Sequence, residues 1–440
     1  MLTYNLRLAW HSVKRNPMLT ALIVTGIALG VGVATPALTT IHVLGQDPIP
    51  QRSGVLHYVR MDSWDPAVPY PGRGGIPTQI TYRDMREIMK SRIPVRQTAD
   101  FQAALYVYPG DRRQRPSRET VRMAFSDFFP MFDVPLRYGS GWDKAADAKP
   151  EAVVVINDDL NIRLFGGGNS VGRIVRIADR DFRVVGVLAP WRPRTLFYDP
   201  TNSGGQPESI FMPFNWIEPM EIRSNGQRDG WKSMEGNPTY VERLHGSETV
   251  FLQMWVDLPD PTRARAYHEF LDAYVREQKK FGRFQRPLDN RVTSLSSLLA
   301  EWQAVGPIFK AIATISVLFL IVASLNLIGL FLGKFLARAP VVGIRRALGA
   351  SRASIFLQHL IECELVGLIG GALGLLISVG VLSLLNKGSE RLTHRPDLFQ
   401  LDVTMVLAAF LLSLAAGAIA GIYPAWRICS IPPAQHLKNQ

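Results

Sequence analysis

The sequence predicts a membrane protein with four transmembrane α-helices and a large α+β extracytoplasmic domain inserted between the first and second spans. The mean hydropathy of +0.07 is too high for an ordinary soluble chain of 440 residues. This value arises from four long uncharged stretches, and each one reaches the roughly 20 apolar residues that a helix needs to cross a bilayer. The stretches lie at residues 16–46, 311–333, 365–386 and 403–426.

The distribution of charge predicts the orientation of these spans. Residues 45–305 contain 35 Lys and Arg against 32 Asp and Glu, whereas the rest of the chain contains 14 against 5. The loop between the second and third spans is strongly basic, and residues 387–402 are neutral. Because loops with excess Lys and Arg stay in the cytoplasm, both termini and the second loop are expected inside. The same distribution argues against nucleic acid as a partner.

The spans divide the chain into segments with distinct expected roles. An uncleaved first span is favoured over a signal peptide, because its apolar run exceeds the usual 7–15 residues. The N-terminal segment is expected to be an amphipathic helix on the membrane lipids or an extension of the first span. The expected segments are an amphipathic helix (1–16), span one (17–46), a periplasmic domain of two subdomains (47–293), a stalk with span two (294–333), a cytoplasmic coupling loop (334–364), span three (365–386), a short external loop (387–402), span four (403–426) and a cytoplasmic tail (427–440).

The outer domain shows both helical and strand-like patterns. A Pro- and Gly-rich opening (47–77) and an irregular stretch (195–237) interrupt these patterns. Both cysteines, Cys363 and Cys429, lie outside this domain, so no disulfide stabilises it. Strands are expected at 101–108, 121–125, 152–156, 174–177, 182–188 and 250–256, and helices at 81–89, 158–165 and 261–276.

Each span carries two glycines four residues apart, which allow helix backbones to approach closely. The pairs are Gly26/Gly30, Gly329/Gly333, Gly370/Gly374 and Gly417/Gly421. They favour a tight bundle or a dimer. No span has a charge in its middle, which argues against a proton relay. Glu362 and Glu364 are expected in the headgroup region, solvated by water.

The sequence contains no recognisable catalytic, cofactor or metal motif. The nearest match to a phosphate-binding loop, residues 329–334, has three residues between its glycines instead of four and lacks a following Ser or Thr. The eight histidines are scattered without zinc spacing. We therefore expect no enzyme activity in this chain, no cofactor, and ATP hydrolysis in a partner subunit.

The most informative stretch is VGIRRALGASRASIFLQHLIE, residues 342–362. Ile344 and Leu348 form an apolar ridge one helical turn apart, and Gly349 is placed to end this helix before Ser351 caps the next. The stretch is either a docking element for a cytoplasmic partner or an ordinary positively charged loop. As a docking element, its expected residues are Gly343, Ile344, Arg345, Arg346, Ala347, Leu348, Gly349, Ala350 and Ser351.

This stretch resembles the IGIRRALGAS signature of the FtsX-like permease family, and in particular the MacB-type permeases of ABC transporters. The resemblance continues through the glycines of span three to the Gly-Ile-Tyr-Pro-Ala run at 421–425 and Pro-Ala-Gln-His-Leu at 433–437. It also covers residues 164–187 of the outer domain. One departure is Ala-Pro-Val-Val at 339–342, where the family usually has an Arg-Glu pair. A heteromeric transporter with an unlike second permease is one explanation.

The resemblance implies a permease subunit in the bacterial inner membrane that transmits the motion of a separate cytoplasmic ABC ATPase to its periplasmic domain. A second permease, the same or homologous, completes the dimer. The expected activity is export of a drug, peptide or similar cargo through a periplasmic adaptor and an outer-membrane duct. The alternatives are lipoprotein release from the inner membrane and regulation of a periplasmic hydrolase. A membrane-anchored enzyme is disfavoured because no site is visible.

Overall fold

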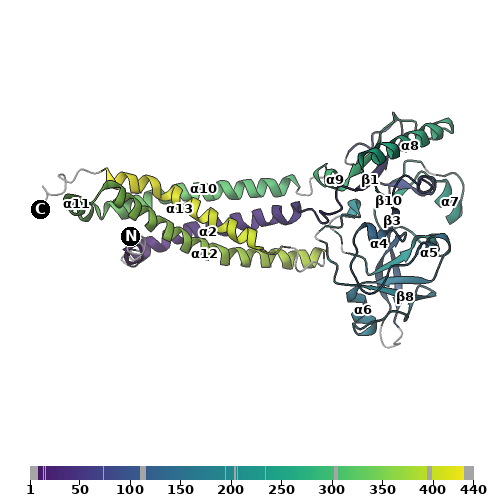
Figure 1. Ribbon diagram of the computed structural model, residues 1–440, viewed down its shortest axis with the longest axis horizontal. Helices are drawn as coiled ribbons and strands as arrows, with labels where there is room; N and C mark the ends of the chain where they lie inside the picture. The colour runs from purple at the N-terminus through teal and green to yellow at the C-terminus, as the bar shows by residue number, and fades with distance from the viewer. Residues whose placement is uncertain are drawn as a thin grey trace. The chain divides into compact units, whose positions relative to one another are not determined.

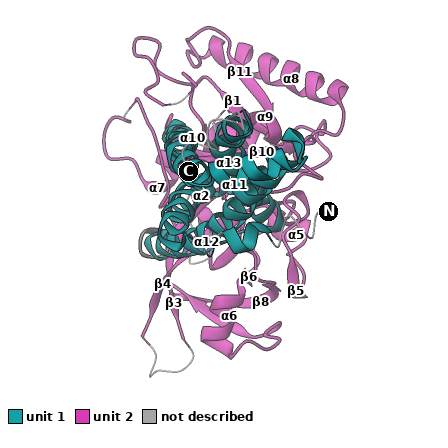
Figure 2. Ribbon diagram, turned by 90° about the vertical axis from the view of Figure 1, so that its left-hand side faces the viewer, with its two compact units in different colours: residues 1–46, 304–440 teal, residues 47–303 magenta. Residues whose placement is uncertain are grey.

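The computed structural model describes residues 8–12, 14, 16–72, 74–109, 115–193, 195–202, 205, 207–232, 234–301, 306–393 and 399–430. The chain forms two compact units, shown in different colours in Figure 2. One contains residues 1–46 and 304–440, and the other contains residues 47–303. We call them the helical unit and the outer domain.

The outer domain is built on one mixed β-sheet (Figure 1). Within the described residues its strands are β1 (Leu56–Met61), β2 (Ile80–Thr81), β3 (Gln97–Tyr108), β4 (Ser117–Ala124), β5 (Leu136–Gly139), β6 (Val153–Ile156), β7 (Ile174–Ile177), β8 (Arg180–Leu188), β9 (Ile210–Pro213), β10 (Val250–Asp257) and β11 (Asn290–Ser294). The main path runs β11-β1-β10-β3-β4-β9-β6-β8-β5, while β2 pairs with β10 and β7 pairs with both β3 and β8. The helices are α3 (Tyr82–Ile88), α4 (Phe128–Met131), α5 (Lys144–Ala148), α6 (Asp158–Phe165), α7 (Tyr240–Gly246), α8 (Pro261–Lys280) and α9 (Leu295–Glu301).

Several predicted elements are confirmed, and local chemistry explains their ends. Helix α6 has the predicted bounds because Asn157 Oδ1 accepts the backbone N–H of Leu160 at 2.8 Å and Gly166 adopts a left-handed φ of +82°. Strand β7 also has the predicted bounds, whereas β10 and α8 extend past theirs. The all-apolar run at 153–156 is the fully buried strand β6.

Alternating side chains of the sheet enter two separate hydrophobic clusters. Val154 and Ile156 of β6 lie in one cluster with Phe101, whereas Val153 and Val155 lie in the other. Because successive side chains in a strand point to opposite faces, both faces of this sheet are covered. The apolar strands are therefore buried on two sides, which explains why β6 has no polar position.

The sheet also contains strands where the sequence predicted irregular structure. Strand β9 lies within the stretch 195–237 and is fully buried, and β1 lies within the Pro- and Gly-rich opening. Strand β9 has only four residues and lies between turn-forming segments, so its pattern of apolar residues is too short to predict a strand. Since strands from throughout residues 47–303 join one sheet, the expected two subdomains are continuous through it.

A buried arginine connects the middle strands of the outer domain. Arg122 on β4 donates from Nη1 to Asp100 Oδ1 at 2.9 Å and from Nη2 to Asp199 Oδ2 at 2.7 Å, and it also bonds Glu208. All four side chains are buried. Desolvation raises the pKa of Asp100 well above its usual range despite the attraction of Arg122.

The helical unit contains, among the described residues, four helices long and apolar enough to cross a membrane. They are α2 (Pro17–Gly45), α10 (Pro307–Leu336), α12 (Arg352–Thr393) and α13 (Val403–Cys429). This confirms the four predicted spans. Helices α2 and α13 each contact the other three, so these two form the centre of the bundle (Figure 1).

Several helix boundaries differ from the prediction, most of all in α12, which begins at Arg352 inside the expected coupling loop. Helix α12 continues through Lys387 to Thr393, because a charged residue leaves the hydrocarbon without ending a helix; the loop expected from 387 therefore starts later. Residues 294–333, which were expected to form a stalk with span two, also do not form one continuous helix. Leu295 and Leu298 of α9 pack into the outer-domain core, and a new helix begins at Pro307, whose ring cannot continue a preceding helix.

The glycines of three spans lie where helices touch. A Cβ at Gly30 would lie 2.6 Å from Leu320 Cδ1 of α10, and one at Gly374 would lie 2.9 Å from the carbonyl oxygen of Ala28 on α2. Gly26, Gly370, Gly417 and Gly421 make comparable approaches. In contrast, a Cβ at Gly329 or Gly333 would meet no described atom within 4 Å. The pairs Gly26/Gly30, Gly370/Gly374 and Gly417/Gly421 therefore serve packing within one chain.

We predict that Gly374→Val lowers stability by about 1–3 kcal/mol, because the added carbons force α12 away from the α2 backbone. The thermal unfolding midpoint of the purified chain in detergent measures this effect. Gly380→Val is the matched control: it lies on the same helix, and its added Cβ would meet no described atom within 4 Å. Equal midpoints for the two variants would contradict the assigned packing.

Candidate coupling site

The predicted docking element forms a short helix, α11 (Ala339–Ala347), between α10 and α12. Ala339 and Val342 on one side of α11 are buried in the core of the helical unit. On the other side Ile344 is 55% exposed and Leu348, just past the helix end, is 84% exposed. The predicted apolar ridge therefore faces outward, without a partner among the described residues.

The turn after α11 has a fixed geometry. Gly349 has φ +98°, and its N–H donates to Arg346 O at 3.1 Å. The N–H of Ala350 donates to Arg345 O at 3.0 Å. These two bonds form a Schellman motif, which ends a helix with a left-handed residue. Ser351 Oγ then accepts the N–H of Ser354 at 3.2 Å at the start of α12. The predicted roles of Gly349 and Ser351 in the turn are confirmed.

The two adjacent arginines of α11 hold different neighbours. Arg345 donates from Nη1 to Gln358 Oε1 on α12 at 3.0 Å, and Arg346 donates from Nη1 to the carbonyl oxygen of Cys429 on α13 at 3.1 Å. The sequence analysis placed both arginines in the docking element. In the structure each has a bond within the chain, because adjacent helical residues point about 100° apart.

A buried ion cluster lies where α10 and α12 meet. Lys334 Nζ lies 2.8 Å from Glu362 Oε1, and Arg338 Nη1 lies 3.4 Å from Glu362 Oε2. The side chain of Lys334 is 0% exposed and that of Glu362 is 2% exposed. In so dry a site, charges are stable only when they are paired and hydrogen-bonded.

The ends of two other segments complete this cluster. Ser12, in the helical stretch 8–12, bonds both Arg338 and Glu362 through its hydroxyl, and its carbonyl oxygen accepts from Arg338 Nη2 at 3.2 Å. Lys334 Nζ also donates to Thr20 Oγ1 of α2 at 3.3 Å. The cluster therefore joins the N-terminal helical stretch, α2, α12 and the end of α10 that leads into α11.

The expectation that Glu362 is solvated among lipid headgroups is wrong. The position of Glu362 along its span suggested the headgroup region. Burial also depends on which side of the helix carries the residue, and Glu362 lies on the side that faces Lys334 of α10. One signal in the sequence pointed to the pair: Lys334 closes one span and Glu362 opens the next, antiparallel one, which places opposite charges at one depth. Glu364, two residues further along α12, lies on another side of the helix from Glu362 and is half-buried.

Two known domains match the sequence. The MacB-like periplasmic core domain matches residues 20–272, and the FtsX-like permease C-terminal domain matches residues 313–433. The chain belongs to the family of MacB-like, FtsX-like permeases. This confirms the resemblance carried by residues 342–362, and the second match includes all of α11 and the turn at Gly349.

Relatives of this permease carry an ATP-binding part as well. The chain is 24% identical to the macrolide export ATP-binding/permease protein MacB of Syntrophobacter fumaroxidans, over 99% of this chain and 64% of that protein. It is 23% identical to MacB of Acinetobacter baylyi, over 74% and 44%. It is 25% identical to the pyoverdine export ATP-binding/permease protein PvdT of Pseudomonas entomophila, over 71% and 42%. The permease spans less than two thirds of these relatives' length.

Among solved structures, the permease is similar to the periplasmic region of MacB from Actinobacillus actinomycetemcomitans. The identity is 12% and the TM-score 0.37, over 59% of this chain and 97% of that chain. The extracellular domain of the ABC-type transporter YknZ from Gram-positive bacteria matches with 11% identity and a TM-score of 0.30, over 48% and 88%.

We predict that Glu362→Ala destabilises the permease by about 3–5 kcal/mol, because it leaves Lys334 buried without its carboxylate. The double variant Lys334→Met, Glu362→Leu should recover most of this loss, since it removes both charges and keeps their volume. Thermal unfolding in detergent measures both. Glu364→Ala is the matched control and should change little, because Glu364 has no ion pair among the described residues. A double variant as unstable as Glu362→Ala would contradict this account.

Proposed function

We propose that this chain is the permease unit of a MacB-like ABC transporter and carries the motion of a cytoplasmic ATPase to its extracytoplasmic domain. The observation that supports this most directly is the outward ridge of Ile344 and Leu348. An exposed apolar ridge on a short helix is the shape that enters a groove on a partner. We propose a separate ATPase subunit as the source of this motion, because these 440 residues themselves contain no phosphate-binding loop.

The path of the motion follows the contacts of α11. A displacement of Leu348 acts through the Schellman turn on α12, and through Arg338 and Lys334 on Glu362 of the same helix. Helices pack as nearly incompressible bodies, so displacement of one end is passed along the bundle. The described spans hold no buried charge outside the ends next to α11, which fits a mechanical role better than a polar pathway through the bilayer.

The cargo is proposed from the relatives. MacB is named for macrolide export and PvdT for pyoverdine export, so we propose export of a small molecule or peptide, with a second permease completing the dimer. Co-purification from mild detergent followed by mass spectrometry tests this. A periplasmic adaptor supports export, whereas a lipoprotein or a periplasmic hydrolase as the bound partner would favour lipoprotein release or hydrolase regulation instead.

The first prediction of this proposal concerns topology. Both termini and α11 are expected in the cytoplasm, and residues 47–303 outside. The variant Ser140→Cys should react with an impermeant maleimide in intact cells, while Ser351→Cys should react only after the inner membrane is opened. The native Cys363 and Cys429 are buried and give little background. The reverse pattern of labelling would overturn the orientation.

The second prediction concerns coupling. Leu348→Asp should abolish capture of the ATPase subunit, because docking would bury an unpaired carboxylate at a cost of several kcal/mol. Arg345→Ala should weaken capture by about 1 kcal/mol or less, since the guanidinium is partly solvated. Pull-down of the ATPase from membranes that contain each variant measures both effects.

Ser354→Asp is the control for the added charge, because it lies in the same segment, is exposed and is outside the ridge. It should bind the ATPase normally. If this segment is only a positively charged loop, the ranking reverses: loss of arginine disturbs insertion, and Leu348→Asp binds as wild type does.

The permease purified alone should hydrolyse no ATP.

A further inference from the structure

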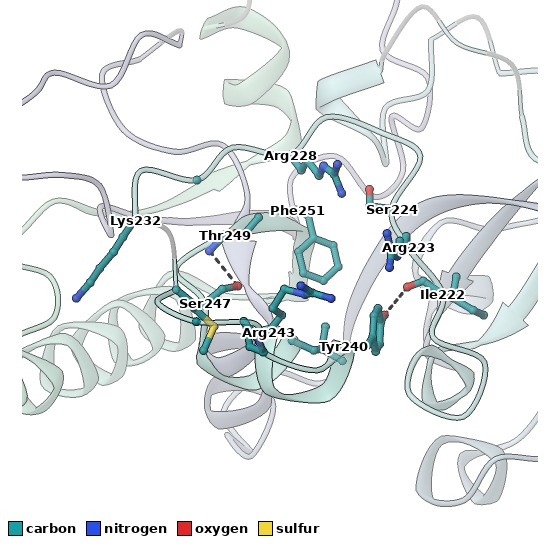
Figure 3. A pocket seen from close by; sticks show the side chains of 15 residues that line it. Ile222, Arg223, Ser224, Arg228, Lys232, Tyr240, Arg243, Ser247, Thr249 and Phe251 are labelled. Atoms are coloured by element: carbon teal, nitrogen blue, oxygen red, sulfur yellow. Dashed lines mark hydrogen bonds between the residues drawn. The ribbon is translucent and has the colours of Figure 1, made fainter.

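A basic pocket lies on the outer domain, away from the coupling site in the sequence and in the other unit of the structure. Its volume is about 520 Å³. Its walls come from three segments: the loop 222–238, helix α7 and the start of β10 (Figure 3). The size falls within the roughly 300–1,000 Å³ of pockets that hold small molecules.

The base of this pocket is apolar and fixed. Phe251 of β10 lies in the middle of Figure 3, and its ring packs edge-on against Phe101 with centroids 5.4 Å apart. Leu244 and Ile222 line the pocket and are buried. The Tyr240 hydroxyl donates to Ile222 O at 2.5 Å, which connects helix α7 to the loop. Phe251 is only partly buried, so its ring offers an apolar surface to a ligand.

The loop that carries the basic residues is attached to the sheet. The N–H of Asn225 donates to Gln102 O at 2.8 Å, and Asp229 and Val250 exchange two backbone bonds of 3.0 and 2.8 Å. The backbone positions of Arg223 and Arg228 are therefore set by β3 and β10. The basic side chains start from fixed points around the pocket.

Three arginines surround this apolar base. In Figure 3 the side chains of Arg223, Arg228 and Arg243 extend toward the space around Phe251, whereas Lys232 extends away from it. In the part of the chain that the structure describes, no hydrogen bond or ion pair is made by any of these three guanidinium groups. Like charges that share one concave site repel one another, and an anion between them relieves this repulsion.

Three of the neighbouring carboxylates bond to other groups, whereas no side-chain bond is made by Glu221 or Glu235 among the described residues. Asp229 accepts from the Tyr70 hydroxyl at 2.8 Å and from Gln227. Glu248 binds Arg283 at 2.6 Å, and Glu242 accepts the N–H of Thr239 in a capping box. These three acids alternate along the chain with pocket residues, yet none lines the pocket. Every charged side chain among the described residues that line the pocket is therefore basic.

We propose that this pocket binds a small amphipathic anion: a flat apolar body that lies on Phe251, with two or more acidic groups that meet the three arginines. Guanidinium groups suit carboxylate, sulfonate and phosphate oxygens, which they bind in pairs. A bare inorganic anion would use the arginines and leave the apolar base uncovered. The pocket therefore favours a ligand with both parts.

The test uses the full chain in nanodiscs of phosphatidylcholine, with 1,3,6,8-pyrenetetrasulfonate as the probe and its fluorescence anisotropy as the readout. We expect saturable binding that weakens with added salt. Arg228→Ala and Arg243→Ala should each raise the Kd about tenfold, the change that corresponds to loss of about 1.4 kcal/mol. Arg176→Ala, an exposed arginine on β7 that does not line the pocket, should leave the Kd unchanged.

A second arm separates an amphipathic ligand from a simple anion. Phe251→Leu should raise the Kd of pyrenetetrasulfonate. It should leave unchanged the affinity with which inorganic sulfate competes for the pocket. Absence of saturable binding, or equal weakening by Arg176→Ala, would overturn the proposal. Sulfate binding as tight as that of pyrenetetrasulfonate would also overturn it. The measurement requires neither ATP nor a partner, so its result is independent of the proposed transport function.

Discussion

The buried pair of Lys334 and Glu362 is the interaction on which the helical unit depends. Lys334 is near the end of α10 and Glu362 is in the third turn of α12, so their 2.8 Å contact joins the end of one span to the start of the next. Helix α11 and its turn lie between them along the chain. Leu348 is exposed because Ala339 and Val342, on the other side of α11, are buried in the core of the helical unit.

The outer domain follows a different rule, because its strands pair across long stretches of sequence. Strand β1 near the start of the domain pairs with β11 at its end, with His57 opposite Ser294. The two links to the membrane spans therefore leave from neighbouring strands. Arg122 and its three carboxylates occupy the centre of the same sheet, where strands β3 and β4 meet the segments that carry Asp199 and Glu208. A domain without disulfides thus closes through its sheet.

Much of this structure could be predicted from the sequence wherever the determining signal is local. Helix α6 shows this with a cap at Asn157 and a glycine at 166, and the four spans show it by length and apolarity alone. The turn at Gly349 belongs to the same class. The burial of Glu362 and the strand β9 could not be predicted in this way, since both depend on neighbours more than 20 residues away. The bond of Arg346 to Cys429, 83 residues away, was missed for that reason too.

Helix α12 has 42 residues and is therefore about 63 Å long, about twice the 30 Å of the hydrocarbon layer. Glu362 holds it near one end, and Thr393 lies 31 residues further, about 46 Å along the axis. The helix can act as a lever with its pivot at the ion pair. A tilt of about 5° around Glu362 would displace Thr393 by about 4 Å, so a movement of α11 too small to break its own turn is enlarged at the opposite end of the same helix.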